Sequence, residues 1–313
     1  MPEWLYEAGI GEARAALIDG DRIVEAAIEL PATLRLGTVA TARLVELTAG
    51  GMGRLSIAGD DALLPRIPKG LTKGATLTVE IVREAIPEPG RPKPPRAVAT
   101  DATPADGPDL LARLHATSHP VRTLRPHEPD ALEAAGWSEL LEEAMDGAIA
   151  FPLGALRLSP TPAMTLFDVD GPPPLESLAV AAAKAVAGAI RRHGIGGSIG
   201  IDFPTLEGKA VRQAVAEALD AALMPPFERT AVNGFGFLQI VRPRPRASLP
   251  ELLRADPVGA ATRALLRRLE REPPGSPLHH RLPAPVHARL VSCPDWLAEL
   301  ARRTGVTHLF DSL

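Results

Sequence analysis

Apolar and polar residues alternate in short runs along the first third of the chain. Runs from Trp4 to Ala8 and from Ala13 to Leu17 precede Asp19-Gly20-Asp21, a typical hairpin turn, and a third run follows it. Beyond Gly37 the alternation continues through residues 38–47, 53–58, 62–67 and 76–84, with glycine-rich turns between them. This spacing predicts a β-hairpin followed by a small β-barrel.

A proline-rich segment follows the predicted barrel. Residues 86–95 contain five prolines and cannot form a helix or a central strand, so we expect a stiff, extended connector. Residues 110–117 and 121–124 have an extended pattern. Residues 128–145 carry apolar side chains at helical spacing and predict one amphipathic helix.

Two apolar runs in the second half of the chain carry aspartates near their ends, Met164 to Gly171 and Ser198 to Pro204. They flank a predicted helix at about residues 174–193. A strand, helix, strand arrangement brings Asp168, Asp170 and Asp202 to one edge of a sheet. Carboxylates are good ligands for magnesium. Proteins commonly bind Mg²⁺ through one or two carboxylates together with a phosphate of the substrate. The alternative is that these aspartates only cap turns.

Further helices are predicted at residues 207–223, 252–272 and 295–304. Lys209 and Arg212 lie in the first turns of the helix after Asp202, where they either bind a phosphate with help from the helix dipole or are simply exposed. The proline- and histidine-rich residues 273–285 predict a loop. His279 and His280 lie in it without further ligands at metal-binding spacing.

At 313 residues, the chain is long enough for about two domains. Its 45% hydrophobic and 23% charged residues are typical of a soluble globular protein. We expect a cytoplasmic protein without a membrane partner, because no apolar stretch approaches 20 residues and the acidic start is unlike a signal peptide. The single cysteine, Cys293, excludes internal disulfides and a cysteine-rich zinc site.

A formal net charge of −4 gives no general support for nucleic-acid binding, but the distribution of charge is uneven. Residues 228–273 contain nine arginines and five acidic residues. Some of these arginines have the spacing of a solvated helix face. Arg242, Arg244 and Arg246 alternate instead, so we expect them to leave a strand on one face, beside the aspartates, and to hold a polyanion.

Residues 151–246 resemble the catalytic region of the ribonuclease E/G family. The resemblance lies in four ordered elements after an apolar lead-in from Phe151. They are Phe167-Asp-Val-Asp-Gly171, an alanine-rich helix ending Ile190-Arg-Arg192, Gly196-Gly-Ser-Ile-Gly-Ile-Asp-Phe203, and Asn233-Gly-Phe-Gly-Phe-Leu-Gln-Ile-Val-Arg242. The resemblance implies that Asp168 and Asp202 bind a catalytic Mg²⁺, or Mn²⁺ in its place. Asp170 stands where the family has an asparagine-like residue.

The resemblance also implies a fold of the α/β (α+β) class. An OB-fold barrel (residues 35–98) would be inserted in a reduced RNase H-like subdomain (1–34 and 109–150). A deoxyribonuclease I-like catalytic subdomain (151–249) and a helical C-terminal region (250–313) would follow. Arg91, Lys93 and Arg96 match a basic segment that runs towards the active site in the family, where they either contact phosphates or only keep a linker soluble.

The chain departs from the family pattern in three places. Residues 37–85 contain no aromatic residue, although OB-type domains commonly stack bases on aromatics. The residues between the barrel and Leu110 are too few to hold the family's sensor of the RNA 5′-monophosphate. The family's Cys-x-x-Cys zinc link is also missing, so we expect no zinc and either a monomer or a dimer without a zinc bridge.

We therefore expect a magnesium-dependent endoribonuclease acting on single-stranded RNA, in RNA processing or decay. A second hypothesis is an RNA-binding paralogue that has lost turnover. It is favoured by the short Pro172-Pro-Pro link where the family has a longer polar stretch. A structural or assembly module is a third. Cleavage of a single-stranded RNA with and without magnesium separates the first hypothesis from the other two.

Overall fold

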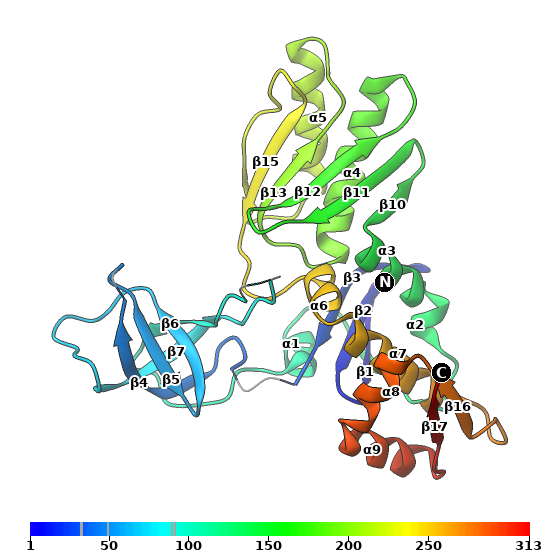
Figure 1. Ribbon diagram of the computed structural model, residues 1–313. Coiled ribbons are helices and arrows are strands. Elements are labelled where there is room, and N and C mark those ends of the chain that lie inside the picture. Colours follow the sequence, from blue (N-terminus) through cyan, green and yellow to red (C-terminus); the bar gives the residue numbers. More distant parts are fainter. Residues whose placement is uncertain (32–33, 49, 89, 91) are drawn as a thin grey trace.

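The opening sheet joins segments that lie far apart in the sequence. The computed structural model describes residues 1–31, 34–48, 50–88, 90 and 92–313. Strands β1 (Glu3–Ala8), β2 (Ala13–Asp19) and β3 (Arg22–Glu29) form an antiparallel meander, which confirms the predicted hairpin. Strand β9 (Val121–Thr123) pairs with β1 in parallel, so the barrel lies in the sequence between two parts of one sheet (Figure 1).

The barrel closes through five strands in the order β4-β5-β6-β8-β7. Four of them, β4 (Val39–Leu47), β5 (Gly53–Ile57), β6 (Asp60–Leu64) and β7 (Thr76–Arg83), match the predicted strands. The fifth, β8 (Arg96–Ala99), follows the proline-rich connector. Alternate apolar residues fill the interior, among them Leu44, Leu55, Ile57, Leu64 and Ile81. The described chain is thus a mixed α/β protein with a closed five-stranded barrel.

The extended structure predicted for residues 110–117 is wrong, because this segment begins with helix α1 (Leu110–His115). Asp109 caps the helix, and its Oδ1 accepts a hydrogen bond from the Ala112 amide at 2.8 Å. Leu110 and Leu114 are four residues apart on one face and pack against the opening sheet. An aspartate cap and a single apolar pair were too weak a pattern to identify.

Two long predicted helices are each broken in two. Residues 128–145 form α2 (Ala131–Ala134) and α3 (Trp137–Asp146), separated by Gly136 with φ of 91°. Residues 252–272 belong to α6 (Leu249–Ala255) and α7 (Pro257–Glu270). Pro257 has no amide hydrogen and disfavours helical backbone at Asp256, so the first helix ends there.

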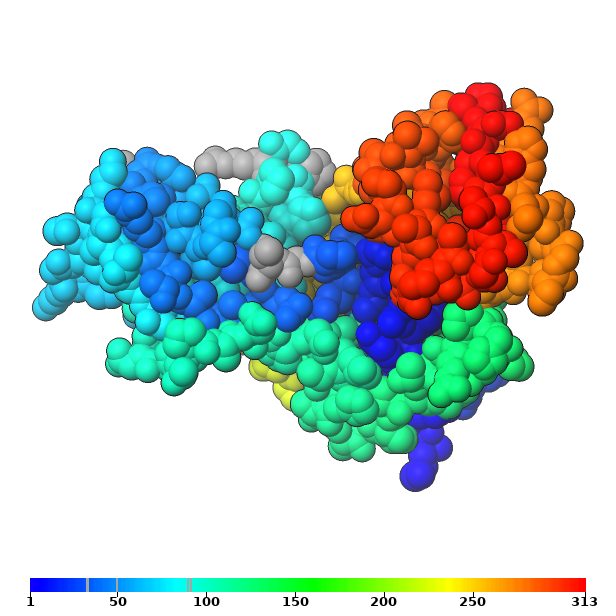
Figure 2. All heavy atoms as spheres, turned by 90° about the horizontal axis from the view of Figure 1, so that it is seen from below, coloured from blue at the N-terminus to red at the C-terminus, as the bar shows by residue number. Residues whose placement is uncertain are grey.

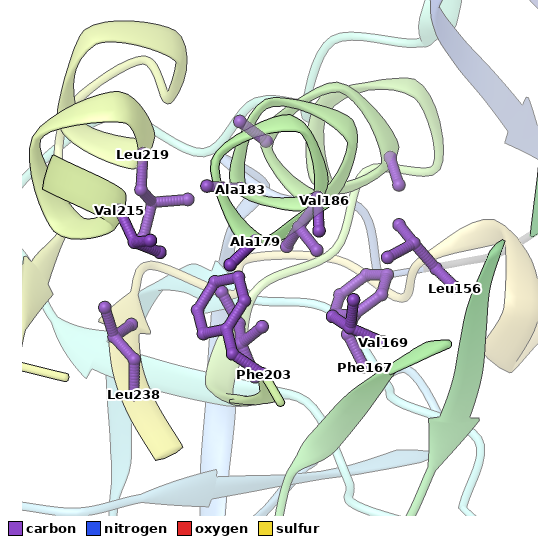
Figure 3. Close-up of a cluster of buried hydrophobic side chains, with 14 of the residues drawn as sticks. Leu156, Phe167, Val169, Ala179, Ala183, Val186, Phe203, Val215, Leu219 and Leu238 are labelled. Carbon is purple, nitrogen blue, oxygen red and sulfur yellow. The ribbon is translucent and has the colours of Figure 1, made fainter. Parts of the chain in front are cut away.

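The second sheet has the order β10-β11-β12-β13-β15-β14. Its strands are β10 (Ala148–Phe151), β11 (Gly154–Pro160), β12 (Thr165–Asp170), β13 (Gly197–Asp202), β14 (Glu228–Arg229) and β15 (Phe237–Arg242). Helices α4 (Leu175–Arg192) and α5 (Lys209–Ala222) confirm the helices predicted after the two aspartate-bearing strands. Both pack on one face of the sheet, where apolar side chains from strands and helices form the largest buried cluster (Figure 3).

The C-terminal region was expected to be helical, but it also contains a small sheet. Helices α8 (Ala284–Val291) and α9 (Pro294–Thr304) accompany strands β16 (His279–Leu282) and β17 (Leu309–Ser312), which pair in parallel. His279 and His280 therefore lie in a strand, and His279 Nε2 lies 2.7 Å from an Asp311 carboxylate oxygen. Figure 2 shows this region (orange to red) against the opening strands and the barrel projecting at the other side.

A buried ionic cluster joins the C-terminal helices to the opening sheet. The Arg14 side chain is fully buried and forms an ion pair with Glu7. Arg267 of α7 donates from Nε to Glu7 Oε1 at 3.0 Å and pairs with Asp130 at 2.6 Å, while Arg271 also binds Glu7. Burial raises the pKa of Glu7, but the three arginines outweigh it and hold that pKa below its ordinary value.

We expect Glu7→Gln to lower the free energy of unfolding at neutral pH by about 3 to 5 kcal/mol, because it leaves buried arginines without their counter-charge. A carboxylate whose folded pKa is lowered stabilises the fold above its unfolded pKa, and this contribution is lost as pH falls through the folded pKa. The variant should therefore lose less stability than the wild type between neutral pH and acid. Urea unfolding at several pH values measures both effects.

Glu3→Gln is the matched control for this prediction. Glu3 pairs with Arg122 at 3.5 Å, but both side chains are well exposed. Such surface pairs contribute less than about 1 kcal/mol. Equal losses of stability in the two variants would contradict a special role for the buried cluster.

Candidate metal and nucleic-acid site

Asp168 and Asp202 lie directly opposite each other on neighbouring parallel strands. They are register partners at the carboxyl ends of β12 and β13, and adjacent strands in a sheet are separated by about 4.8 Å. Asp170 follows Asp168 by two residues on the same strand, and all three side chains are exposed. The predicted juxtaposition of the aspartates at one sheet edge is present.

The alternation of the strands sends the three carboxylates to the face away from the helices. Phe167 and Val169 are buried against α4, so Asp168 and Asp170 point to the opposite face (Figure 3). Ile201 is likewise buried, whereas Asp202 is exposed. In Figure 1, no helix covers this face of the sheet, so the aspartates face solvent there.

Arg157 and Phe237 flank the two aspartates on the adjoining strands. Arg157 of β11 is the register partner of Asp168, and Phe237 of β15 is the partner of Asp202. Within the described part of the chain, no hydrogen bond or ion pair engages the carboxylates of Asp168, Asp170 or Asp202. Their charges are therefore available to an external cation.

The carboxylates at this edge are suited to a divalent cation, such as Mg²⁺, that takes only a few of its ligands from the protein. Among the residues described, no group of three or more His, Cys, Asp or Glu side chains is arranged to hold a metal ion. The edge thus offers the two paired carboxylates of Asp168 and Asp202. Magnesium commonly binds in this way, with waters and substrate phosphate completing its octahedral shell.

A tight turn adjoins Asp202. Gly236 O accepts a hydrogen bond from Phe203 N at 3.2 Å, and Gly236 has φ of 92°. A Cβ at this glycine would lie 2.3 Å from the Phe203 carbonyl oxygen, so no side chain fits. Phe235, in the same turn, is 85% exposed. The family resemblance placed residues 233–242 in one strand, but residues 233–236 form this turn before β15. The exposure of Phe235 and the position of Arg157 opposite Asp168 were not predicted.

Lys209 and Arg212 lie on α5, which begins soon after Asp202. Lys209 is the first residue of the helix and is exposed. Arg212 donates from Nη1 to the Leu206 carbonyl oxygen at 2.9 Å, which fixes its side chain to the loop before the helix. Of these two predicted phosphate ligands, Lys209 is the one with a free ammonium group within the described structure.

The expectation that Arg242, Arg244 and Arg246 lie beside the aspartates is wrong. Strand β15 runs antiparallel to β13, so Phe237 pairs with Asp202 while Arg242 pairs with Gly197. Five residues of strand separate the two ends, or about 17 Å. The three arginines leave the sheet at the end opposite to the aspartates.

Two of them, Arg244 and Arg246, instead attach the barrel and its connector to the rest of the protein. Arg244 pairs with Glu88 of the connector at 3.1 Å and with Glu251, and Arg246 pairs with Glu84 at 2.9 Å. Burial lowers the pKa of both Arg242 and Arg246. With Arg242, they line a cleft of about 870 Å³ between the barrel, the opening sheet and α4.

Lys93 of the proline-rich connector lies in the same region as Arg244, far from the aspartates. Lys93 pairs with Glu88 at 2.5 Å, and Glu88 in turn binds Arg244, which packs against Gly196 and Gly197 at the start of β13. The expected path of this basic segment towards the aspartates is therefore not found. Arg96 is exposed at the start of β8. Arg91 lies outside the described residues.

Compared with models of known protein families, the chain matches none, and it has no match among curated proteins. Across the described ranges, no helix is both long and apolar enough to cross a membrane.

We expect Gly236→Ala to destabilise the fold by about 1 to 3 kcal/mol, since it places a Cβ against Phe203 in a left-handed backbone conformation. Gly234→Ala, in the same turn, is the control. No heavy atom lies within 4 Å of its Cβ position and its φ is not left-handed, so a change below about 0.5 kcal/mol is expected. Chemical denaturation of both variants measures the difference, and equal stability would contradict the described turn.

Proposed function

We propose that this chain is a magnesium-dependent endoribonuclease of the ribonuclease E/G type, which cleaves single-stranded RNA during RNA processing or decay. The in-register pair of Asp168 and Asp202 carries the proposal. Two exposed carboxylates on neighbouring strand ends, with no partner among the residues that the structure describes, are suited to binding Mg²⁺ with a phosphate. The four ordered sequence elements that resemble the family support the same activity.

The architecture is compatible with the family's arrangement. We propose that the five-stranded barrel is an OB-fold domain and that β1, β2, β3 and β9 belong to a reduced RNase H-like subdomain around it. The six-stranded sheet with α4 and α5 would be the deoxyribonuclease I-like subdomain. Support comes from the order of the elements, since β3 and β9 flank the barrel in the sequence and share one sheet.

In this proposal, Asp168 and Asp202 hold the metal through one carboxylate each. When bound, a divalent metal polarises a phosphoryl oxygen and lowers the pKa of a coordinated water. Asp170, two residues along the same face, accepts a hydrogen bond from a water and orients it. Arg157 and Lys209 supply positive charge near the edge, where they attract the phosphates that flank the scissile bond.

RNA binding without turnover is the second candidate, and one observation favours it. Arg157 lies opposite Asp168 in the sheet, so a modest movement of its guanidinium would neutralise that carboxylate in place of a metal. The protein would then hold RNA without activating a water. Magnesium-dependent cleavage would exclude this candidate.

Asp168→Asn and Asp202→Asn should each lower magnesium-dependent cleavage by about 100-fold or more, because each removes one charged metal ligand at constant volume. Stability should stay the same or rise by up to about 1 kcal/mol, since neither carboxylate has a partner in the described structure and each substitution removes the repulsion between the two. Initial rates on a fluorogenic single-stranded RNA, with magnesium or with excess EDTA, measure the effect.

Glu228→Gln is the control for these variants. Glu228 is an exposed carboxylate on β14 of the same sheet and pairs with Val241, away from the aspartates. Its removal should leave the rate unchanged. Full activity in both aspartate variants, or undiminished cleavage in EDTA, would overturn the metal mechanism.

The rate should also be insensitive to the RNA 5′ end. A 5′-monophosphate is recognised by a dedicated group of cationic and amide donors, and residues 97–110 contain no Lys or Arg. We expect 5′-monophosphorylated and 5′-hydroxyl forms of one RNA to be cleaved within about threefold of each other, equivalent to less than about 0.7 kcal/mol. A preference of tenfold or more at limiting substrate would show that another surface recognises the 5′ end.

A further inference from the structure

Phe235 is unusually exposed for a large apolar side chain. At 85% exposure it exceeds every other large apolar residue of the described chain except the terminal Met1. Phenylalanine is among the residues most often buried. Phe237, two residues later, is half-buried, and an atom of its ring lies 2.7 Å from where a Cβ on Gly200 would lie.

The turn that carries Phe235 is held by its own hydrogen bonds. Asn233 Oδ1 accepts from the amides of Phe235 at 2.9 Å and Phe237 at 3.0 Å. Asn233 N donates to Phe237 O at 3.0 Å, and Gly236 N donates to Asn233 O at 3.2 Å. The exposed ring therefore projects from an ordered backbone, so a ligand that covers it loses little conformational entropy in ordering the turn.

The ring also lies close to the two paired carboxylates. Phe237 is the register partner of Asp202, and Phe235 lies two residues before Phe237 in the chain. The cross-strand spacing and the length of two extended residues limit its Cα to about 13 Å from that of Asp202. A nucleotide bound at the carboxylates is thus within reach of the ring.

We propose that Phe235 is a stacking platform for one unpaired base of an RNA strand whose phosphodiester lies at Asp168 and Asp202. This rests on the proposed function, which places the phosphate at the carboxylates. Bases stack on aromatic rings whatever their sequence. Gly234 and Gly236 on either side of Phe235 carry no side chain that would compete for the ring. A base inside a duplex is already stacked between its neighbours, so the platform selects single strands.

The test measures binding of a short, fluorescein-labelled single-stranded RNA with Ca²⁺ in place of Mg²⁺. Ca²⁺ also takes carboxylate and phosphate oxygens as ligands, so it can hold the strand at the carboxylates. Phe235→Leu keeps an apolar side chain but removes the aromatic face, so Kd should rise about 5- to 100-fold. Phe235→Trp should bind within about threefold of the wild type. Leu309→Ala, at another exposed apolar position, on β17 (61% exposed), should leave Kd unchanged.

A series of RNAs with a single abasic position locates the stacked base. At one position, loss of the base should weaken binding by the wild type but not by Phe235→Leu, because the variant has no ring for that base to contact. The proposal is overturned if Phe235→Leu binds as the wild type does. It is also overturned if every abasic position weakens both proteins equally, or if the duplex binds as well as the single strand.

Cleavage assays with magnesium separate this proposal from the nuclease function. If one abasic position weakens binding by the wild type but not by Phe235→Leu, and no RNA is cleaved, the stacking site is supported and the nuclease function is overturned. Cleavage that depends on Asp202, together with wild-type binding and cleavage by Phe235→Leu, would retain the nuclease and overturn the stacking site. Failure to bind single-stranded RNA would overturn both.

Discussion

The parallel pairing of β12 with β13 is the constraint on which the functional face depends. Because side chains alternate along a strand, a slip of one residue would turn Asp168 into the core and expose Phe167. Helix α4 fixes this register, since its small buried residues, such as Ala179 and Ala183, let it lie close to the sheet (Figure 3). The same packing that builds the core therefore brings the two carboxylates side by side.

The direction of the strands places the arginines that follow β15 at one end of the sheet and the aspartates, with their cationic neighbours, at the other. Arginines at the far end of β15 are neutralised by glutamates of the barrel and its connector, as in the pairing of Arg246 with Glu84. In Figure 1, β12 and β13 run away from the barrel towards the aspartate edge. The barrel is thus anchored at one end of the sheet and the carboxylates lie at the other, so their cationic neighbours come from β11 and α5 instead.

Local patterns in the sequence were sufficient to predict many of the strands and helices. The features that were missed depend on how distant segments pair or on where a helix is interrupted. Alternation identified four barrel strands, and helical periodicity identified α4 and α5. The breaks at Gly136 and Pro257 were missed because apolar spacing continues across them. For the site, the strand-helix-strand pattern brought Asp168 and Asp202 together correctly. The position of Arg242 was wrong because it depends on the antiparallel direction of β15, which no local signal in the sequence specifies.

The adjacent carboxylates at the aspartate edge support the proposed metal site, because no ion pair in the described structure engages either of them, although Arg157 lies across from Asp168. Two carboxylates on adjacent strands repel each other by about 1 kcal/mol in water at a spacing of about 5 Å. Stability alone would favour an opposite charge or a neutral side chain at one of them, as in the barrel, where Arg54 lies between Glu46 and Asp61. Positions at which a chain departs from such local rules are commonly functional sites. In the proposed function, a divalent cation would remove this repulsion, and waters and a phosphate oxygen would fill its remaining coordination positions.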